Sequence, residues 1–438
     1  MTGSNYPLTG FVHTPRISAA ANLRPLLREA FDEQISNKNL EFEFLLACCA
    51  QPLNYGRLEE FLSRRWHWRT FISLAEHHRV VPQVYRSLAP YSNQLPILEF
   101  ATLRAKYQEN ARNALWFTSE LVRTVKHLEC QGITAIPYKG PALAQMLYGA
   151  VTARQFSDLD ILVRPEDVPK AKMALAQLGY KSTVDLAAPA ARAYISSGYE
   201  CPFDGVAGPH LLELQWRIVP RFYSIEFDVE NLLQRAGQIT LGEHKFPALS
   251  ADDLLLVLCV HAAKHLWLQL SWLCDIAELA SSPRIAWDSV WQRSRQLGIQ
   301  RIVAVNVLLA HDLLGSVLPP QIQGWVRKDR ASVFLKGEVL QIIRCGLPLD
   351  TESPTYFRFI LRLRERWRDQ FWFLWRLLWT PGLSEWSMAS LPESLSWLYH
   401  GIRLFRLAKR FASLARARLA FFVASERPAA NPRATTLL

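Results

Sequence analysis

Long apolar runs are scarce in this sequence of 438 residues. No window approaches the roughly 18 uninterrupted apolar residues that a membrane-spanning helix needs. The richest stretch, Phe371 to Trp379, is shorter and contains Arg376. The residues up to Arg24 are polar and are broken by Pro7 and Pro15, so they lack the apolar centre of a signal peptide. We therefore expect a cytoplasmic protein without a spanning helix.

Cysteine and glycine are also sparse. The seven cysteines are odd in number, and no two of them have the CxxC spacing that is typical of zinc or redox sites. Neither a disulfide framework nor a zinc site is therefore indicated, and the pattern favours buried free thiols in a reducing compartment. With only 19 glycines, no repeat and no low-complexity tract, the composition indicates a compact globular protein rather than a fibrous or disordered one.

Acidic residues are outnumbered by basic ones. The chain has 50 Lys and Arg against 39 Asp and Glu, which gives a formal net charge of +11. A charge of this sign suits an anionic partner, and a nucleotide, a nucleic acid and an acidic membrane surface all remain open. The 15 tryptophans are unusually many for one chain.

The spacing of apolar residues predicts a short α/β segment between two helical sections. The predicted fold class is therefore α+β, with a small mixed sheet embedded in mostly helical N- and C-terminal regions. The first helical section runs from Leu26 to Cys130, and the second begins at the Ser250 to Asp253 capping pattern. The segment between them contains predicted strands at Ile133–Tyr138 and Leu159–Val163, predicted helices at Pro141–Tyr148 and Asp167–Leu178, and a predicted hairpin of Tyr199–Phe203 with Leu211–Trp216.

Asp158 and Asp160 flank the first residue of the second predicted strand. Side chains alternate along a strand, so both carboxylates project from the same face. Like charges at that distance repel each other, and without a cation one of them would tend to hold a proton. Mg²⁺ is typically held by one or two carboxylates together with substrate phosphates. The pair therefore predicts a cation site, and the alternative is a strand start with two solvated acids.

Glu213 is the candidate for a third carboxylate. It is a single acid in the last predicted strand, where Leu212 and Leu214 face the opposite side. The alternative is an exposed residue on a hairpin. Lys139, at the end of the first predicted strand, is a candidate for binding phosphate or an ordinary surface lysine.

The order of these residues resembles the nucleotidyltransferase superfamily typified by DNA polymerase beta. The resemblance rests on a strand, a turn at Gly140, a short helix, the Asp158/Asp160 pair on a second strand and a later acidic strand. Lys139-Gly140, Arg154 and the later run His261-Ala262-Ala263-Lys264-His265 followed by Asp275 resemble, more closely, an uncharacterised bacterial nucleotidyltransferase family that is itself similar to abortive-infection toxin nucleotidyltransferases. The close resemblance covers about Glu43 to Ala280, with a weaker echo in Leu391 to Lys409.

The resemblance implies transfer of a nucleoside monophosphate from an NTP, such as ATP, to a hydroxyl or phosphate acceptor, with release of pyrophosphate. It implies Mg²⁺, with Mn²⁺ as the alternative, held by Asp158, Asp160 and Glu213. The residues implied in nucleotide binding are Lys139, Gly140, Arg154, Ser157, Lys264 and Asp275. The acceptor stays open between a small molecule, a peptide or protein side chain and a tRNA, and so does the oligomeric state.

The chain departs from the superfamily pattern at two positions. Pro141 stands where the phosphate-binding turn has serine, so that side-chain contact is lost and Lys139, Ser157 or Arg154 would have to supply it. Gln215 stands where the family is expected to favour histidine.

The expected domains follow from this assignment. They are a disordered N-terminus at 1–23, a helical region at 24–130, a nucleotidyltransferase α/β core at 131–249, a helical region completing the active-site cleft at 250–345, a basic Trp-rich helical region at 346–425 and a flexible tail at 426–438.

Two other groups of residues have competing interpretations. His261, Lys264, His265 and Asp275 fall near one face of a single helical pattern, and packing histidines are favoured over a zinc site because no glutamate follows His261. In the C-terminal region, arginines alternate with Trp367, Trp372 and Trp375, which is typical either of amphipathic helices packed on a core or of a surface for a membrane or a nucleic acid. The rival functions are therefore a non-catalytic docking adaptor with a degenerate core and a nucleic-acid binding module.

Overall fold

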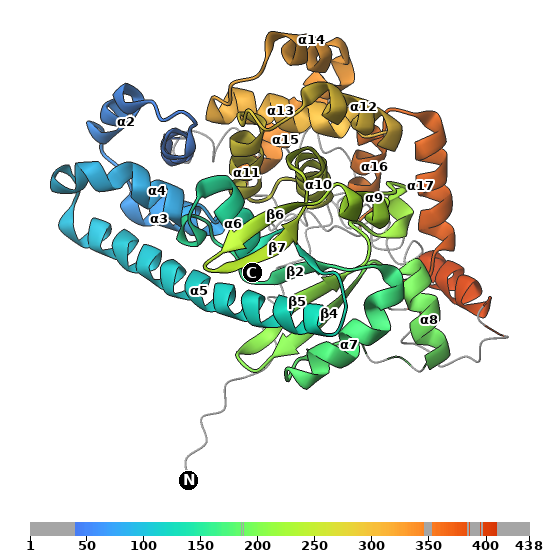
Figure 1. Cartoon of the computed structure of the whole chain (residues 1–438). Coiled ribbons are helices and arrows are strands. Elements are labelled where there is room, and N and C mark those ends of the chain that lie inside the picture. Colours follow the sequence, from blue (N-terminus) through green and yellow to red (C-terminus); the bar gives the residue numbers. More distant parts are fainter. Residues whose placement is uncertain are drawn as a thin grey trace, which may run out of the picture. The chain divides into compact units, whose positions relative to one another are not determined.

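The computed structural model describes residues 40–184, 186, 188–345, 353–382, 385, 395 and 397–409 (Figure 1). The N-terminus predicted at 1–23 and the tail predicted at 426–438 lie outside the described residues. The described residues from 40 to 403 belong to one compact unit. The predicted fold class is confirmed, since a small mixed sheet is embedded among many helices.

The front section is helical, as predicted. Residues 40–49 are helical, and the next elements are α2 (Tyr55–Leu62), α3 (Trp68–His77), α4 (Val81–Leu88), the 3₁₀ turn η1 (Ala89–Gln94) and α5 (Ile97–Cys130). In α5 the fully buried residues include Leu121, Val125 and Leu128, whose spacing places them on one face. Most of the other α5 side chains are exposed or partly exposed, so this helix covers its neighbours with a single stripe.

A five-stranded sheet lies at the centre of the unit, with the strand order β1-β2-β5-β4-β3. Its strands are β1 (Ile136–Pro137), β2 (Leu159–Leu162), β3 (Lys181–Ser182), β4 (Glu200–Gly205) and β5 (Gly208–Gln215). Strands β2 and β5 are parallel, and all other pairs are antiparallel. A parallel pair needs a crossover connection, and here the chain from α7 (Val168–Gln177) to β4 supplies it.

Two predicted strands differ from the structure in their bounds. The predicted strand Ile133–Tyr138 shortens to β1, because the N–H of Ile133 donates to the carbonyl of Leu128 and so closes the end of α5. The hairpin is confirmed, but its strands extend to Gly205 and Gly208, which pair with each other. The residues that the sequence predicts for the turn, Asp204-Gly205 and Gly208-Pro209, therefore lie within the strands, and the turn itself is Val206-Ala207.

Other elements of the central segment are helices and one further hairpin. The predicted helix Pro141–Tyr148 is α6 (Gly140–Tyr148), and 3₁₀ turns occur at η2 (Val151–Ala153), η3 (Pro165–Asp167) and η4 (Arg221–Tyr223). The remaining helices are α8 (Ala188–Ser197) and α9 (Val229–Gln234), and β6 (Gly237–Leu241) pairs with β7 (His244–Ala248). This second hairpin was not predicted from the sequence.

The two faces of the central sheet differ in chemistry. One face is apolar, and its side chains form a buried cluster with α5 and α7; Ile161, Leu212 and Leu214 in this cluster have no exposed surface. Figure 1 shows α5 running along this side of the sheet. The opposite face carries Asp160 and Glu213, since they alternate with the apolar residues. Helices from later in the chain pack on this second face, where Ile136 and Leu162 share a buried cluster with residues of α10 (Ala251–Lys264).

Helices complete the unit after the second hairpin. They are α10 (Ala251–Lys264), α11 (Leu270–Ala280), α12 (Trp287–Leu297), α13 (Gln300–Leu314), α14 (Pro320–Lys328), α15 (Arg330–Cys345), α16 (Pro354–Leu363) and α17 (Trp367–Trp379). The Ser250 cap is confirmed, because its hydroxyl accepts from the N–H of Asp253. The single helical pattern expected from His261 to Asp275 is wrong: Leu266 and Trp267 adopt positive φ angles, and the chain turns there between α10 and α11.

The cysteines agree with the expectation of free thiols. Five of those that the structure describes are buried, including Cys259 and Cys274, while Cys130 is exposed. No helix in the described part of the chain has both the length and the apolarity that crossing a membrane requires.

Candidate active site

The parallel pairing of β2 and β5 sets the position of the predicted third acid. Asp160 and Glu213 are direct neighbours in the register of the two strands. Their side chains therefore share one face, and Asp158, two residues before Asp160, precedes the same strand. Asp160 is buried, with 3% of its surface exposed, and Glu213 is partly buried. The sheet thus gathers the carboxylates that the sequence singled out.

Gln215 joins two of these carboxylates. Its amide nitrogen Nε2 donates to Asp160 Oδ1 at 3.1 Å and to Glu213 Oε2 at 2.9 Å. Its amide oxygen accepts a hydrogen bond from the hydroxyl of Tyr138. Nε2 also lies 3.5 Å from Oε2 of Glu200, on the neighbouring strand β4. One buried amide therefore contacts three carboxylates and fixes how they lie.

Lys139 neutralises the centre of this acidic group. Its ammonium donates to Asp160 Oδ1 at 2.6 Å, and both side chains are largely buried. Burial alone would lower the pKa of Lys139, but the nearby acidic groups, Asp160 foremost, together outweigh burial and raise it. Lys139 is therefore charged, and it balances part of the negative charge that the strands gather.

The remaining acids, if all of them ionised, would bring together more negative charge than this one ammonium can balance. Burial, followed by repulsion from Asp160 and Glu200, raises the pKa of Glu213 to about 8. Burial and the nearby Asp160 carboxylate also raise the pKa of Asp158. Acids that resist ionisation in the free protein ionise readily beside an added cation. This electrostatic pattern is typical of sites that bind a positively charged ligand.

The first turn of α6 lies close against the backbone of Asp158. Gly140 begins α6 with a φ of +56°, and a Cβ atom at this position would lie 3.1 Å from the carbonyl oxygen of Asp158. Only glycine adopts this backbone without strain. Lys139 is the N-cap of α6, and Pro141 occupies its first turn, where a missing N–H costs no intrahelical hydrogen bond.

Two predicted nucleotide-binding residues pair with each other. Arg154 Nε lies 2.9 Å from Asp275 Oδ2, and both side chains are almost completely buried. The Tyr148 hydroxyl donates to Asp275 Oδ1 at 2.9 Å. Burial lowers the pKa of Arg154, but Asp275 together with Tyr148 and Asp158 outweighs burial and raises it. The ion pair holds the segment before β2 against α11. It therefore helps to position Asp158, although neither Arg154 nor Asp275 is one of the clustered carboxylates on the sheet.

Ser157 and Lys264 lie at the edges of the acidic group. The Ser157 hydroxyl accepts from Arg79 at 3.2 Å, and Arg79 has a positive φ in the connection between α3 and α4. The Lys264 ammonium donates to the hydroxyl of Tyr199 at 3.2 Å and lies 4.6 Å from the centre of its ring. Burial outweighs the attraction of Glu200 and lowers the pKa of Lys264. A basic rim therefore borders the carboxylates.

His261 and His265 are packing residues, as expected, rather than a zinc pair. Their ring centres lie 4.6 Å apart, and both rings pack against Trp272 of α11. Burial lowers the pKa of His261 well below its usual range and that of His265 to about 3. The single helical face expected for His261 and Asp275 is wrong, because Asp275 belongs to α11 and His261 to α10.

The donor set fits Mg²⁺ in chemistry, since its ligands are carboxylate oxygens. Within the described residues, however, no group of three or more His, Cys, Asp or Glu side chains is arranged to hold a metal ion as it stands. The structure shows a physical reason at Asp160: Lys139 and Gln215 both contact its Oδ1. A protein cation thus occupies the place next to Asp160 that a metal ion would need.

Three contributors to this site were absent from the sequence prediction. Gln215 was noted only as a departure from histidine, while Glu200 and Arg79 were not singled out. The alternation of β5 could have shown that Gln215 shares the face of Glu213. Glu200 and Arg79 needed the strand register and the fold around the α3–α4 connection, which no local pattern encodes.

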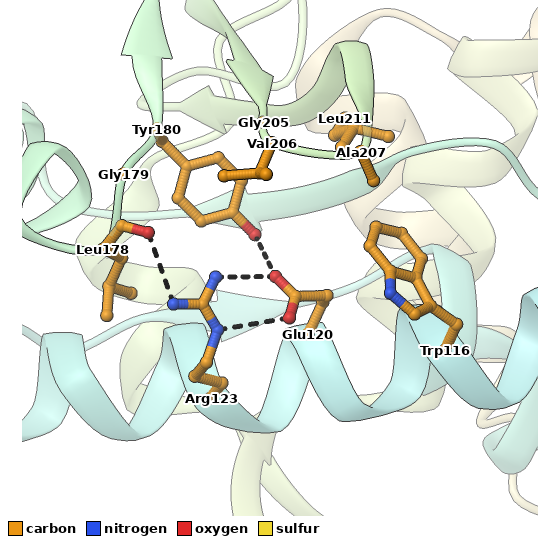
Figure 2. Close-up of a pocket in the computed structure, with 10 residues that line it drawn as sticks. All are labelled: Trp116, Glu120, Arg123, Leu178, Gly179, Tyr180, Gly205, Val206, Ala207 and Leu211. Carbon is orange, nitrogen blue, oxygen red and sulfur yellow. Dashed lines mark hydrogen bonds and ion pairs between the residues drawn. The ribbon is translucent and has the colours of Figure 1, made fainter.

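A separate hollow of about 340 Å³ lies away from these residues, between α5, the end of α7 and the β4–β5 turn (Figure 2). Its polar groups satisfy one another, because Arg123 and the Tyr180 hydroxyl both donate to Glu120, and Arg123 also donates to the carbonyl of Leu178. None of the predicted site residues lines it.

Comparison with known proteins identifies a family. No curated protein and no solved structure matches the chain. The model of a family described as "Uncharacterised nucleotidyltransferase" matches residues 65–315, which is more than half of the chain and includes every residue of the candidate site. The nucleotidyltransferase activity that the family description names agrees with the acidic face of the β2–β5 pair. The chain belongs to this family of uncharacterised nucleotidyltransferases.

Proposed function

We propose that the protein is a nucleotidyltransferase that requires a divalent cation, Mg²⁺ or alternatively Mn²⁺, and transfers a nucleoside monophosphate from an NTP to a hydroxyl or phosphate acceptor. The observation that carries the proposal is the direct pairing of Asp160 with Glu213 across two parallel strands, with Asp158 just before the first of them. Pyrophosphate is the leaving group of this reaction.

Asp158, Asp160 and Glu213 are the proposed metal ligands. Bound there, Mg²⁺ would activate the acceptor oxygen and offset the charge that develops on the leaving pyrophosphate. Gln215 holds Asp160 and Glu213 in position, since one amide nitrogen contacts both. The raised pKa of Glu213 supports this role, because a group that is crowded by like charge gains most from a cation.

Lys139 has a proposed double role. In the structure its ammonium balances the charge of Asp160. When a divalent cation takes over that charge, the ammonium becomes free to contact the triphosphate, and it sits at the N-terminus of α6, where Gly140 allows close approach. This arrangement compensates for Pro141, whose side chain offers no hydrogen bond.

Arg154, Ser157, Lys264 and Asp275 are the proposed outer part of the nucleotide site. Lys264 contributes positive charge beside Tyr199. Arg154 and Asp275 act on the nucleotide by fixing the segment before β2, since they pair with each other. The acceptor classes that this chemistry admits are a small molecule, a peptide or protein side chain and a tRNA, and the proposed location is the cytoplasm.

The test is turnover of each radiolabelled NTP with Mg²⁺ and a cell lysate as mixed acceptor. Wild type is compared with Asp160→Asn and Glu213→Gln. Loss of one ligand should lower pyrophosphate release about 100-fold or more, since metal stabilisation of the transition state amounts to several kcal/mol. The matched control is Glu243→Gln, which removes the charge of an exposed acid in the β6–β7 turn and should leave turnover unchanged.

Chelation with EDTA should abolish wild-type turnover, and added Mg²⁺ should restore it. If the wild type releases no pyrophosphate from any NTP, or if Asp160→Asn is as active as wild type, the proposed reaction is wrong. The docking adaptor is then the better interpretation of the chain.

A further inference from the structure

Helix α17 presents a face of large apolar side chains to solvent. All of them are at least two-fifths exposed, and Trp367, with 76% of its surface exposed, is the most open. The members of this outer face are Trp367, Phe371, Trp372, Leu374, Trp375, Leu378 and Trp379. A monomeric soluble protein rarely exposes a contiguous apolar patch of this kind without a use for it.

The outer face is a property of the whole helix rather than of one loose side chain. Its residues recur at helical spacing, as Trp367, Phe371, Leu374, Trp375 and Leu378 do. Phe371, Trp375 and Trp379 form a continuous row of stacked rings.

The opposite side of α17 holds the helix in the unit. Phe373 is fully buried and packs against Phe222 and Tyr223 of η4 and against Phe357 of α16. In Figure 1 α17 lies at the right-hand edge of the picture, with α16 and α9 on its inner side. The helix is therefore anchored by one side and open on the other.

The indole N–H groups of the outer-face tryptophans have no hydrogen-bond partner among the residues that the structure describes. Within the described part of the chain, no residue accepts a hydrogen bond from the indole N–H groups of Trp367, Trp372, Trp375 or Trp379. Burying them against a second protein surface would leave these donors unsatisfied unless that surface supplied acceptors. The boundary between lipid chains and headgroups accepts the apolar ring and hydrogen-bonds the N–H, which is why tryptophan is enriched there.

Positive charge surrounds the same helix. Residues 353–379 include six arginines and two acidic residues. Arg368 lies within the exposed arc of α17, and Arg358 is exposed on α16; neither has an ion-pair partner among the described residues. Three of the other arginines are paired with acids, Arg362 with Glu338, Arg364 with Asp369 and Arg376 with Glu226, so Arg358 and Arg368 supply the unpaired positive charge. The surroundings of the outer face therefore complement an anionic surface.

We propose that the outer face of α17 binds the surface of a membrane that contains anionic lipid. The helix has 13 residues. That length is too short to cross a bilayer, so it lies in the plane of the interface with its tryptophans in the headgroup region. The function proposed for this face is separate from catalysis. Membrane binding brings the enzyme to the membrane surface, and turnover itself does not depend on it.

The experiment is flotation of the full-length protein with vesicles of phosphatidylcholine alone and of phosphatidylcholine mixed with phosphatidylglycerol. Wild type should float with the anionic vesicles and much less with the neutral ones. The double variant Trp367→Ser/Trp375→Ser should bind about 100-fold more weakly, since each buried large side chain accounts for roughly a factor of ten. Arg368→Gln should weaken binding about fivefold on anionic vesicles only.

The matched control is Trp116→Ser, which removes an exposed tryptophan from α5 and should leave vesicle binding unchanged. Wild type that floats with neither vesicle, or a double variant that floats as well as wild type, overturns the proposal. Sedimentation velocity without lipid gives the other decisive outcome: a wild-type dimer that the double variant converts to a monomer would assign the outer face to a second copy of the chain.

Discussion

Gly140 is the residue where the backbone of the candidate site has least freedom. Its φ of +56° disfavours any side chain, and an added Cβ would press on the carbonyl of Asp158 at 3.1 Å. Gly149, at the other end of α6, has a similar φ of +69° but has nothing within 4 Å of an added Cβ. Comparison of the two glycines therefore separates the cost of a positive φ from the effect of close approach to Asp158, a proposed metal ligand.

We predict that Gly149→Ala lowers the free energy of unfolding by about 1 kcal/mol and leaves turnover intact, because only the left-handed backbone is penalised. Gly140→Ala should show the same penalty and, in addition, lose most of its turnover, since Asp158 must shift. Urea unfolding and pyrophosphate release measure the two effects. Equal turnover in both variants would show that the close approach of Gly140 to Asp158 has no part in the reaction.

At the scale of residues, sequence alone was sufficient to single out Asp158, Asp160 and Glu213, because alternation along a strand depends only on neighbours in the chain. It could not predict that Lys139 would lie on Asp160 rather than in solvent, nor that Arg154 and Asp275 would pair. These contacts join residues far apart in the chain, such as Arg154 on the approach to β2 and Asp275 on α11, and they depend on how those elements pack.

Between elements, the Arg154–Asp275 pair is the main polar link from the segment before β2 to α11. Both partners are buried, so removing one leaves an uncompensated charge. Asp275→Ala should therefore lower the free energy of unfolding by about 3–5 kcal/mol. Tyr148→Phe is the matched control, because it removes one hydrogen bond to the same carboxylate and should cost about 1 kcal/mol.

Denaturant unfolding of both variants measures these costs, and NTP titration of the folded fraction separates stability from binding. If Asp275→Ala is as stable as Tyr148→Phe but no longer binds NTP, Asp275 contacts the nucleotide directly and the link between elements is secondary.

Elements were predictable where their signals are local. The cap at Ser250 and the helix α6 follow from nearby residues, and both are confirmed. The break between α10 and α11 was missed because Leu266 and Trp267 are apolar residues with no turn signal, although both adopt positive φ and are fully buried. Packing of the two helices against each other outweighs the local preference there.

On the scale of the whole unit, the sheet is not a module with a core of its own. Its apolar face packs on α5, which belongs to the predicted N-terminal region, and residues such as Ile136 and Leu162 belong to a second core that extends into α10, α13 and α15. The predicted boundaries at 130 and 249 therefore follow changes in pattern and chemistry, whereas the cores run across them. Composition and periodicity report on elements, and they contain no information on which elements share a core.

The isolated segment 131–249 should for this reason fail to fold. Without α5 it loses Leu121, Val125 and Leu128, which are between 0% and 1% exposed in the structure and cover the sheet. At about 1.5–3 kcal/mol for each buried side chain, this loss alone approaches the roughly 5–15 kcal/mol that stabilises a whole domain. We expect 131–249 to show no cooperative thermal transition by circular dichroism, and 97–280, which restores α5, α10 and α11, to recover one. A cooperative transition in 131–249 would instead establish this segment as an independent domain, because the sheet would then be stable without the surrounding helices.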